Sequence, residues 1–370
     1  MKIGLLIYGS LDMVTGGFLY DRFLVEALQS RGDEVEVVSL PWPSYGRGLL
    51  DNFSPSFRKR LARLDCDVLL QDALIHPSFF RLNRWLRHRL GCPLIAVVLH
   101  LQGKEAHAPW RQGLYRWVEK KYLRTMDGFI CISRAIKEDV EKLTGNHRPL
   151  VVARPGGNRL PGEISREEIT SRVLAPGPLE IVFIANLIPR KELHTLIAAL
   201  ATLPREKWRL TAAGSLTMDA PYVARIRRQV EQAGLGAQVD LLGTLDAPEL
   251  AELMARSHLQ AMPSSYEAFG IVYLEGMSFG LPAIAATAGG AREIINHGVD
   301  GYLVAPGDTA ALARRLGDLM GDRRLLLRMS LAAKEKFARY PTWEESLGAV
   351  HLFLHNFMSL RKSGAPGREI

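Results

Sequence analysis

Short apolar runs alternate along this chain with longer segments in which apolar residues recur every three or four positions. The runs are mostly Val, Ile and Leu without polar alternation, which predicts strands covered on both faces and therefore parallel sheets. In the first half of the chain we predict strands at residues 3–8, 35–40, 67–71, 93–99, 129–132 and 150–153. The segment 17–31 carries an apolar stripe typical of a helix.

The alternation stops at residues 154–180, where two clusters of Pro and Gly flank a polar stretch and predict a linker. It starts again beyond this break. Further strands are predicted at residues 181–184, 208–213, 239–242, 259–262, 283–286 and 301–304, before a mostly helical tail at 308–357. The strand–helix order predicts an α/β chain of two Rossmann-like, doubly wound domains that face each other across a cleft.

Composition is compatible with this interpretation. Of the 370 residues, 47% are apolar and 23% charged, which is typical of globular proteins and excludes a disordered or collagen-like chain. No apolar run approaches the roughly 20 residues that a membrane-spanning helix needs, and we interpret residues 3–8 as a strand and not as a signal peptide. Three widely spaced cysteines favour a reducing, cytoplasmic location.

Positive charge is concentrated in one region. The formal net charge is +8, and residues 50–125 contain fourteen Lys and Arg against six Asp and Glu. Aromatic residues such as Trp85, Trp110 and Trp117 are interleaved with the basic ones. Two interpretations are open: this region contacts an anionic membrane surface, at the inner membrane face, or its basic face is simply solvated. No nucleic-acid-binding motif is visible, so we expect no nucleic acid partner.

Residues 264–276, which read SSYEAFGIVYLEG, carry the strongest candidate chemistry. A predicted strand ends before them, and Gly270 is expected to open a helix. Backbone N–H groups at such a helix start favour a phosphate. Glu275 in the second turn is placed to accept hydrogen bonds from two vicinal hydroxyls, as on a ribose. Taken alone, two glutamates at a helix start such as Glu267 and Glu275 are more typical of solvated charges than of a ligand site.

The context of this motif resembles a known family. Residues 239–304 are similar to the carboxyl-terminal half of glycosyltransferase family 4, the glycogen-synthase-like retaining enzymes with the GT-B fold, and a weaker resemblance extends over nearly the whole chain. The matching positions are Gly243, Pro263, Ser264, Glu267, Phe269, Gly270, Glu275, Gly280, Pro282, Gly289, Gly290, Glu293, Asp300 and Gly301. The resemblance implies an enzyme that moves a sugar from a nucleoside diphosphate sugar to an acceptor hydroxyl, for a glycolipid, polysaccharide or other glycoconjugate.

The resemblance also implies roles for residues in the second domain. Glu267 would contact the hydroxyls of the donor sugar, and Glu275 the ribose. The backbone would cradle sugar and diphosphate at Phe269, Gly270, Ile271 and Val272. Lys191 occupies the family's lysine position and would neutralise the leaving diphosphate, with Arg190 as the second cation. The chain departs from the family at Ala185, Asn186 and Glu192, which stand where glycine, arginine and glycine are usual.

In the first domain the resemblance places Gly16 and Gly17 beside the donor diphosphate, and His100 toward donor or acceptor. The turn Gly32-Asp33-Glu34-Val35 is similar to that family's helix-to-strand turn, with Asp33 where histidine is usual. We assign residues 1–160 to an N-terminal acceptor domain and 175–340 to a C-terminal donor domain. A helix at about 343–360 is expected to return to the first domain.

We predict no cofactor beyond the nucleoside diphosphate sugar and no metal. The triplet Asp65-Cys66-Asp67 is interpreted as a loop, because it precedes a predicted strand in the wrong context for a metal-binding D-x-D motif. Two alternatives to a transferase are kept. One is a nucleotide-sugar epimerase, which would need acids and bases around the sugar ring. The other is a non-catalytic nucleotide-sugar-binding protein.

Overall fold

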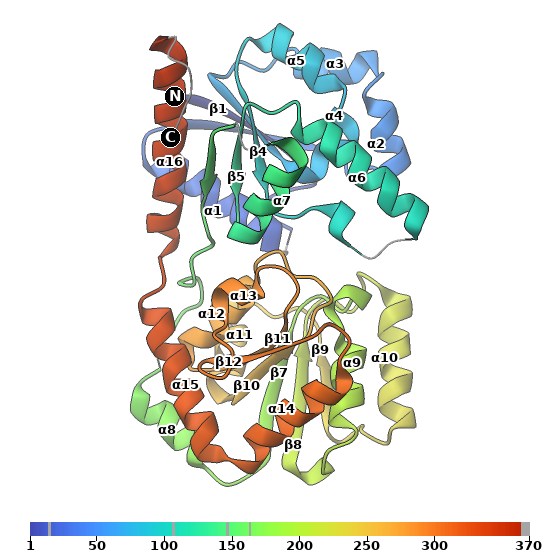
Figure 1. Ribbon diagram of the computed structural model, residues 1–370, viewed down its shortest axis with the longest axis vertical. Helices are drawn as coiled ribbons and strands as arrows, with labels where there is room; N and C mark the ends of the chain where they lie inside the picture. The colour runs from blue at the N-terminus through green and yellow to red at the C-terminus, as the bar shows by residue number, and fades with distance from the viewer. Residues whose placement is uncertain (14–15, 106–107, 146–147, 163, 364–370) are drawn as a thin grey trace. The chain divides into compact units, whose positions relative to one another are not determined.

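The computed structural model describes residues 1–13, 16–105, 108–145, 148–162 and 164–363 (Figure 1). The chain divides into two compact units: unit 1 comprises Met1–Pro155 with Thr342–Ile370, and unit 2 comprises Gly156–Pro341. Each unit contains one six-stranded sheet whose neighbouring strands are all parallel. The predicted α/β class with two doubly wound halves is therefore confirmed.

The sheet of unit 1 has the strand order β2-β1-β3-β4-β5-β6. Its strands are β1 (Lys2–Tyr8), β2 (Glu34–Leu40), β3 (Val68–Asp72), β4 (Leu94–Val98), β5 (Gly128–Cys131) and β6 (Leu150–Val152). Its helices are α1 (Gly16–Ser30), α2 (Tyr45–Asp51), α3 (Pro55–Leu61), α4 (His76–Phe79), α5 (Leu82–Leu90), α6 (Pro109–Leu123), α7 (Arg134–Thr144) and α16 (Trp343–Ser363).

The sheet of unit 2 has the strand order β12-β11-β10-β7-β8-β9. Its strands are β7 (Leu179–Ile184), β8 (Trp208–Ala213), β9 (Val239–Leu242), β10 (Leu259–Met262), β11 (Ala283–Ala286) and β12 (Gly301–Val304). Its helices are α8 (Arg166–Leu174), α9 (Leu193–Leu200), α10 (Ala220–Gln232), α11 (Ala247–Arg256), α12 (Ile271–Ser278), α13 (Ala291–Ile294), α14 (Thr309–Gly321) and α15 (Arg323–Ala338).

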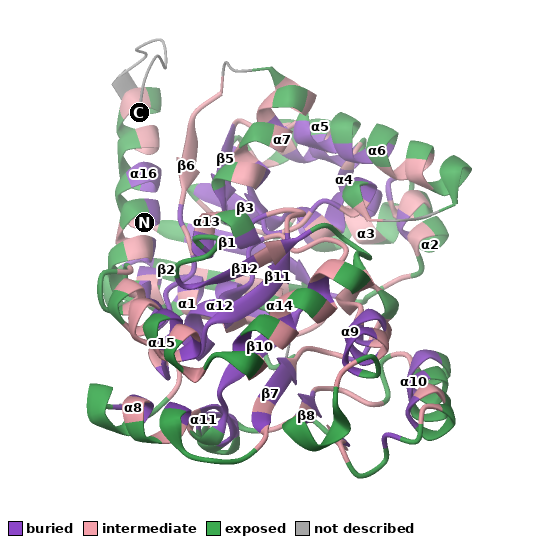
Figure 2. Cartoon of the chain, turned by 60° about the horizontal axis from the view of Figure 1, so that its bottom comes forward, coloured by how far each residue is buried: buried purple, intermediate pink, exposed green. Residues whose placement is uncertain are grey.

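The central strands are buried on both faces, as their continuous apolar sequences require. Every residue of β3, β4, β5, β10 and β11 is buried, and Figure 2 shows β10 and β11 as buried strands of unit 2, while the nearby helices have exposed faces. The edge strand β2 is less covered, and its exposed positions carry Glu34, Glu36 and Ser39. Burial of the apolar runs is thus what orders each sheet.

Helix α16 completes unit 1 rather than unit 2. Trp343 at its first position is 2% exposed. Its ring stacks on Phe23 of α1 with centroids 4.4 Å apart, and meets Tyr20 edge-on at 5.8 Å. The aromatic cluster therefore anchors the last helix of the chain to the first one.

The predicted linker at 154–180 is partly wrong, because it contains helix α8. Ser165 accepts a hydrogen bond from the Glu168 N–H, and the Glu168 carboxylate accepts one from the Ser165 N–H, which forms a capping box. Arg172 then donates to the carbonyls of Ala255 and Phe279 at 2.7 and 2.8 Å. These bonds tie α8 into unit 2, and the spacing Ser-x-x-Glu was the local signal for it.

The strand orders locate the ligand-binding edge of each sheet. In unit 2 the order reverses between β7 and β10, and in unit 1 it reverses between β1 and β3. In doubly wound sheets the loops that follow the two strands at such a point diverge to opposite faces and leave room for a ligand. The loops of interest are therefore those after β7 and β10 in unit 2, and the loop after β1 in unit 1.

Candidate functional site

The loop after β7 carries the predicted cations Arg190 and Lys191, which form a 3₁₀ turn with Pro189. The Arg190 carbonyl accepts a hydrogen bond from the Ser265 N–H at 2.9 Å. The Arg190 guanidinium donates to the carbonyl of Tyr266 at the same distance. Arg190 thus joins the loop after β7 to the loop after β10, and its side chain has a structural partner.

Glu192 and Asn186 are two departures from the family pattern, and the structure shows what each residue does. Glu192 has a φ of 60°, the only positive value among the non-glycine residues that the structure describes. Glycine adopts this left-handed conformation at no steric cost, which is the physical reason for a glycine at this position. Asn186 accepts a hydrogen bond from the Ser215 N–H at 3.2 Å, so its amide ties the loops after β7 and β8 together and supplies no charge.

The loop after β10 holds Glu267 in a fixed place. The Glu267 carbonyl accepts a hydrogen bond from the Gly290 N–H at 2.7 Å. A Cβ atom on Gly289 would lie 1.9 Å from that carbonyl oxygen, and one on Gly290 would lie 2.5 Å from the oxygen of Ala268. Only glycine fits this close approach of two backbones, which accounts for the Gly-Gly pair and positions the Glu267 side chain.

Helix α12 begins directly beyond this loop. Gly270 precedes it with a φ of 98°, and a Cβ atom there would lie 3.3 Å from Cγ of Glu267. The phenol of Tyr273 donates to the Met262 carbonyl at 2.8 Å, and burial, followed by the nearby charge of Glu267, raises its pKa well above the ordinary value. The first N–H groups of α12 therefore lie beside Glu267 at the positive end of the helix.

Lys191 and Glu267 meet at this point. Lys191 Nζ lies 2.5 Å from Glu267 Oε2, and the two side chains are 16% and 13% exposed. The pair connects residues from the two loops that flank the switch point between β7 and β10. One carboxylate, one ammonium group and one helix start are thereby gathered in unit 2. Binding of an anionic ligand at this place stays a prediction.

Glu275 is the most buried charged residue of the predicted site. Its side chain is 4% exposed, and Oε1 accepts a hydrogen bond from Nε of Arg159 at 2.6 Å. Sequence reasoning did not single out Arg159, which lies in the segment 154–180 that was predicted to be a linker. No local pattern marks this residue, since it pairs with a partner 116 positions away.

The side chains of the remaining donor-site residues differ in exposure. Phe269 is 1% exposed and Ile271 9%, so their side chains belong to the core of unit 2. Val272 is half-buried. Contact of a ligand with the backbone at residues 269–272 stays a prediction.

Three predicted residues lie in unit 1. Gly16 and Gly17 open helix α1 after the switch-point strand β1. Val14 and Thr15, which precede them in the chain, lie outside the described residues. His100 follows β4 and its Nε2 lies 2.9 Å from Oε1 of Glu105. The structure therefore places all three beyond the carboxyl ends of strands of the unit 1 sheet.

Glu119 is a further residue near His100 that sequence reasoning missed. Its buried carboxylate accepts hydrogen bonds from the N–H groups of Gln102 and Gly103, at 2.5 and 3.0 Å. Burial raises the pKa of Glu119 to about 7, against the opposing effect of these two bonds. The side chain thus holds the loop that follows His100.

Asp65 and Asp67 have structural partners, as expected of a loop. The Asp65 carboxylate pairs with Lys2 Nζ at 2.7 Å, and Asp67 accepts a hydrogen bond from the Lys2 N–H at 2.8 Å. Both contacts fasten the turn before β3 to the start of β1. The two carboxylates of the triplet therefore fasten the amino-terminal ends of β1 and β3 to each other.

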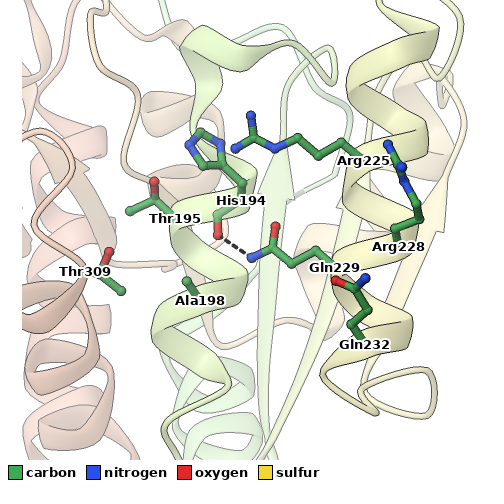
Figure 3. Close-up of a pocket in the computed structure, with 8 residues that line it drawn as sticks. All are labelled: His194, Thr195, Ala198, Arg225, Arg228, Gln229, Gln232 and Thr309. Atoms are coloured by element: carbon green, nitrogen blue, oxygen red, sulfur yellow. Dashed lines mark hydrogen bonds between the residues drawn. The ribbon is translucent and has the colours of Figure 1, made fainter.

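A cavity of about 450 Å³ lies elsewhere in unit 2, between helices α9 and α10 and the start of α14 (Figure 3). Its lining residues are His194, Thr195, Ala198, Arg225, Arg228, Gln229, Gln232 and Thr309. Gln229 donates to the carbonyl of His194 at 2.9 Å and bridges the two helices. None of the predicted site residues lines it, so this cavity is separate from the Lys191–Glu267 pair.

Comparison with known proteins identifies two family matches that together cover most of the chain. Residues 165–336 match the family described as glycosyl transferases group 1, and residues 12–156 match the glycosyl transferase 4-like domain. A glycogen synthase of Mycobacterium tuberculosis is 28% identical over 260 residues, which cover 68% of this chain and 60% of that protein. The chain spans only 23% of another relative, an exopolysaccharide phosphotransferase of Streptomyces coelicolor.

Solved structures share the fold at lower identity. Sucrose-phosphate synthase from Thermosynechococcus elongatus has a TM-score of 0.81 at 20% identity, with 97% of this chain and 99% of that one covered. The Anabaena protein HepE, solved in complex with UDP-glucose, has a TM-score of 0.73 at 21% identity, with 97% and 99% covered. Likeness over nearly the whole length of both chains confirms the predicted two-domain architecture.

Proposed function

The chain belongs to the group 1 glycosyltransferases and has their GT-B fold, and we propose that it transfers a sugar from a nucleoside diphosphate sugar to an acceptor hydroxyl. The observation that carries this proposal is the meeting of Lys191, Glu267 and the start of α12 at the switch point of the unit 2 sheet. The complex of HepE with UDP-glucose supports a donor of this class.

The diphosphate is expected at Lys191 and the first turn of α12. The N–H groups of Ile271 and Val272 belong to the helix positions that have no carbonyl partner within the helix. Together with the Lys191 ammonium they would stabilise the negative charge that grows on the leaving diphosphate. Arg190 holds the Tyr266 carbonyl, which makes it a positioning residue for this loop in our proposal.

The sugar and ribose would engage the two carboxylates. In the structure Glu267 is paired with Lys191. When the donor binds, Lys191 would turn toward the phosphate, and the Glu267 carboxylate would accept hydrogen bonds from sugar hydroxyls. Glu275 would accept bonds from the ribose hydroxyls and is held in place by Arg159. Carboxylate-to-hydroxyl bonds of this kind are charge-assisted and therefore stronger than neutral ones.

We propose that transfer retains the anomeric configuration and uses no metal. The bond between the anomeric carbon and the β-phosphate oxygen breaks, and the acceptor oxygen forms its bond on the same face of the sugar. The proton of the acceptor hydroxyl passes to the departing phosphate. The roles that the family resemblance implies for Gly16, Gly17 and His100 of unit 1 stay predictions. Exclusion of water would prevent hydrolysis of the donor.

The alternative functions have less support. An epimerase or a non-catalytic binding protein would share the fold, but the family matches and the relatives named above favour sugar transfer. The chain spans less than two thirds of the length of the two relatives named above.

A panel of nucleotides tests the proposal. We expect one nucleoside diphosphate, and the matching sugar nucleotide, to raise the melting temperature of the protein more than the corresponding monophosphates, because ligands that bind only the folded state stabilise it. When the stabilising sugar nucleotide carries a labelled sugar, the protein should transfer that label to hydroxyl-bearing molecules of a cell extract. Equal responses to every nucleotide, or stabilisation without any transfer or donor hydrolysis, would contradict a transferase.

We further propose that unit 1 contacts an anionic membrane surface. The part of the chain that the structure describes contains no helix long and apolar enough to cross a bilayer.

Exposed aromatic residues of unit 1 support contact with a membrane surface. Trp110 and Trp117 on α6 are 68% and 52% exposed, and Phe53 beyond α2 is 59% exposed. Cations accompany each ring: Arg111, Lys121 and Arg81 lie 5.1, 5.9 and 5.2 Å from the respective centroids. Interfacial Trp with adjacent basic residues is typical of membrane-contacting surfaces. Contact would place the enzyme peripherally at the inner face of a cytoplasmic membrane.

Vesicle co-sedimentation checks this surface. We expect binding to vesicles that contain phosphatidylglycerol, a loss of binding as salt rises, and weaker binding of a Trp110→Ser/Trp117→Ser variant. Leu174→Ser is the matched control, because Leu174 is an exposed apolar residue of unit 2 (50%). Binding that ignores salt and lipid charge, or no binding at all, would favour a merely solvated basic face.

A further inference from the structure

A cluster of one carboxylate and two imidazoles joins the first and last segments of unit 1. Asp33 lies in the turn between α1 and β2, and His351 and His355 lie one turn apart on α16. Nε2 of His355 is 3.1 Å from Asp33 Oδ1, and Nε2 of His351 is 3.4 Å from Asp33 Oδ2. The two imidazole rings are neighbours, with centroids 4.2 Å apart. Residues more than 300 positions apart thus converge on one carboxylate.

The carboxylate is buried and incompletely partnered. The Asp33 side chain is 2% exposed, and its Oδ2 atom has no hydrogen-bond partner. Oδ1 is better served, because the amino group of Met1 lies 2.9 Å away in addition to His355. A buried carboxylate oxygen without a hydrogen bond is unfavourable unless a cation compensates it. Oδ2 faces the imidazole of His351, so the cluster itself indicates where a cation would sit.

The spacing of these atoms suits a transition metal. One ligand atom from each of the three residues can be chosen so that all lie within 4.8 Å of one another. In a tetrahedral zinc site with bonds of about 2.0–2.1 Å, neighbouring ligand atoms are roughly 3.3 Å apart. The two Asp–His distances, 3.1 Å to Oδ1 and 3.4 Å to Oδ2, involve different carboxylate oxygens. Rotation of the Asp33 carboxylate and the two imidazole rings would bring one oxygen and both nitrogens to this spacing. Histidines four residues apart on a helix present their rings on one face, as metal-binding pairs require.

We propose that Asp33, His351 and His355 bind one divalent transition metal ion of the Zn²⁺ class, which fastens α16 to the turn between α1 and β2. Two imidazoles and one carboxylate are a ligand set that suits zinc, copper, nickel or iron rather than calcium or magnesium. The fourth position would be filled by water. This departs from the absence of metal predicted from the sequence, and it concerns a structural site of unit 1, not the transfer reaction.

Zinc titration of the full chain tests this site. After treatment with chelator, we expect calorimetry to detect one high-affinity equivalent of Zn²⁺, and the melting temperature to rise with zinc. His351→Ala and His355→Ala should each weaken binding by more than the roughly 10- to 100-fold that loss of an outer-sphere partner costs. Both histidines are partly exposed, at 26% and 45%, so that these variants should fold.

The controls separate this site from adventitious binding. His88→Ala removes an exposed histidine outside the cluster and should bind zinc as the unaltered chain does. The Asp33→Asn variant keeps the side-chain volume but lacks the carboxylate, so calorimetry should no longer detect the high-affinity zinc equivalent. Absence of tight binding in the unaltered chain, or undiminished binding by the His351→Ala/His355→Ala double variant, would overturn the proposal. Neither result depends on sugar transfer, so the proposed function stands or falls separately.

Discussion

Lys191→Ala is expected to lower turnover by about 100- to 1,000-fold, the usual cost of removing one group that stabilises charge in a transition state. The ammonium lies 2.5 Å from Glu267 and next to the start of α12, where the leaving diphosphate gathers charge in our proposal. Because that charge is larger in the transition state than in the bound donor, kcat should fall more than donor affinity. Steady-state kinetics and calorimetric titration with the donor measure the two effects.

Two variants make this comparison interpretable. Lys191→Arg keeps a cation at the site and should recover part of the lost rate. Lys207→Ala removes an exposed lysine of unit 2 from the turn before β8 and should leave kcat unchanged. If Lys191→Ala turns over at the normal rate, or if only its KM rises, Lys191 does not stabilise the departing diphosphate.

Glu275→Ala is expected to weaken binding of the nucleotide donor by about 1.5–3 kcal/mol, the value of hydrogen bonds to a charged group. The carboxylate is almost fully buried, so its position is set by the protein rather than by solvent. Removal also leaves Arg159 without this carboxylate partner, and the melting temperature should fall as well. Calorimetry with the nucleoside diphosphate gives the affinity, and thermal unfolding gives the stability.

Arg159→Ala is the matched control for Glu275. Both variants break the same ion pair and should lose stability, but only Glu275→Ala removes the group that would bond to ribose. We therefore expect a larger loss of affinity for Glu275→Ala. This variant should also discriminate less than the unaltered chain against a deoxyribonucleotide, which lacks one ribose hydroxyl. Equal affinity of the Glu275→Ala variant and the unaltered chain would remove Glu275 from the nucleotide site.

The strands were predictable because continuous apolar runs are needed at every buried position of a parallel sheet. The run predicted at 93–99 corresponds to β4 (Leu94–Val98), and that at 67–71 to β3 (Val68–Asp72). Helix α8 escaped prediction because Pro and Gly clusters on both sides suggested a linker, although Ser165 and Glu168 form a capping box between them. A Ser-x-x-Glu capping signal therefore indicates a helix even where it lies between two clusters of Pro and Gly.

From the residues alone, the candidate site was predictable only where it is local in sequence; Lys191 was assigned to it through the family resemblance. Glu267, Gly270 and Glu275 follow one strand and open one helix, so their proximity can be read from a short segment. The pairing of Glu275 with Arg159, and the convergence of His351 and His355 on Asp33, involve contacts between distant segments. Such contacts depend on how the sheet and helices pack, and the periodicity of the sequence does not predict them.

A structure of the protein with bound nucleoside diphosphate tests the central claim most directly. Our account predicts the β-phosphate against Lys191 Nζ and the amides of Ile271 and Val272, with ribose hydroxyls at Glu275. A nucleotide bound in the cavity beside Arg225 and Arg228, with Lys191 still paired only to Glu267, would contradict it.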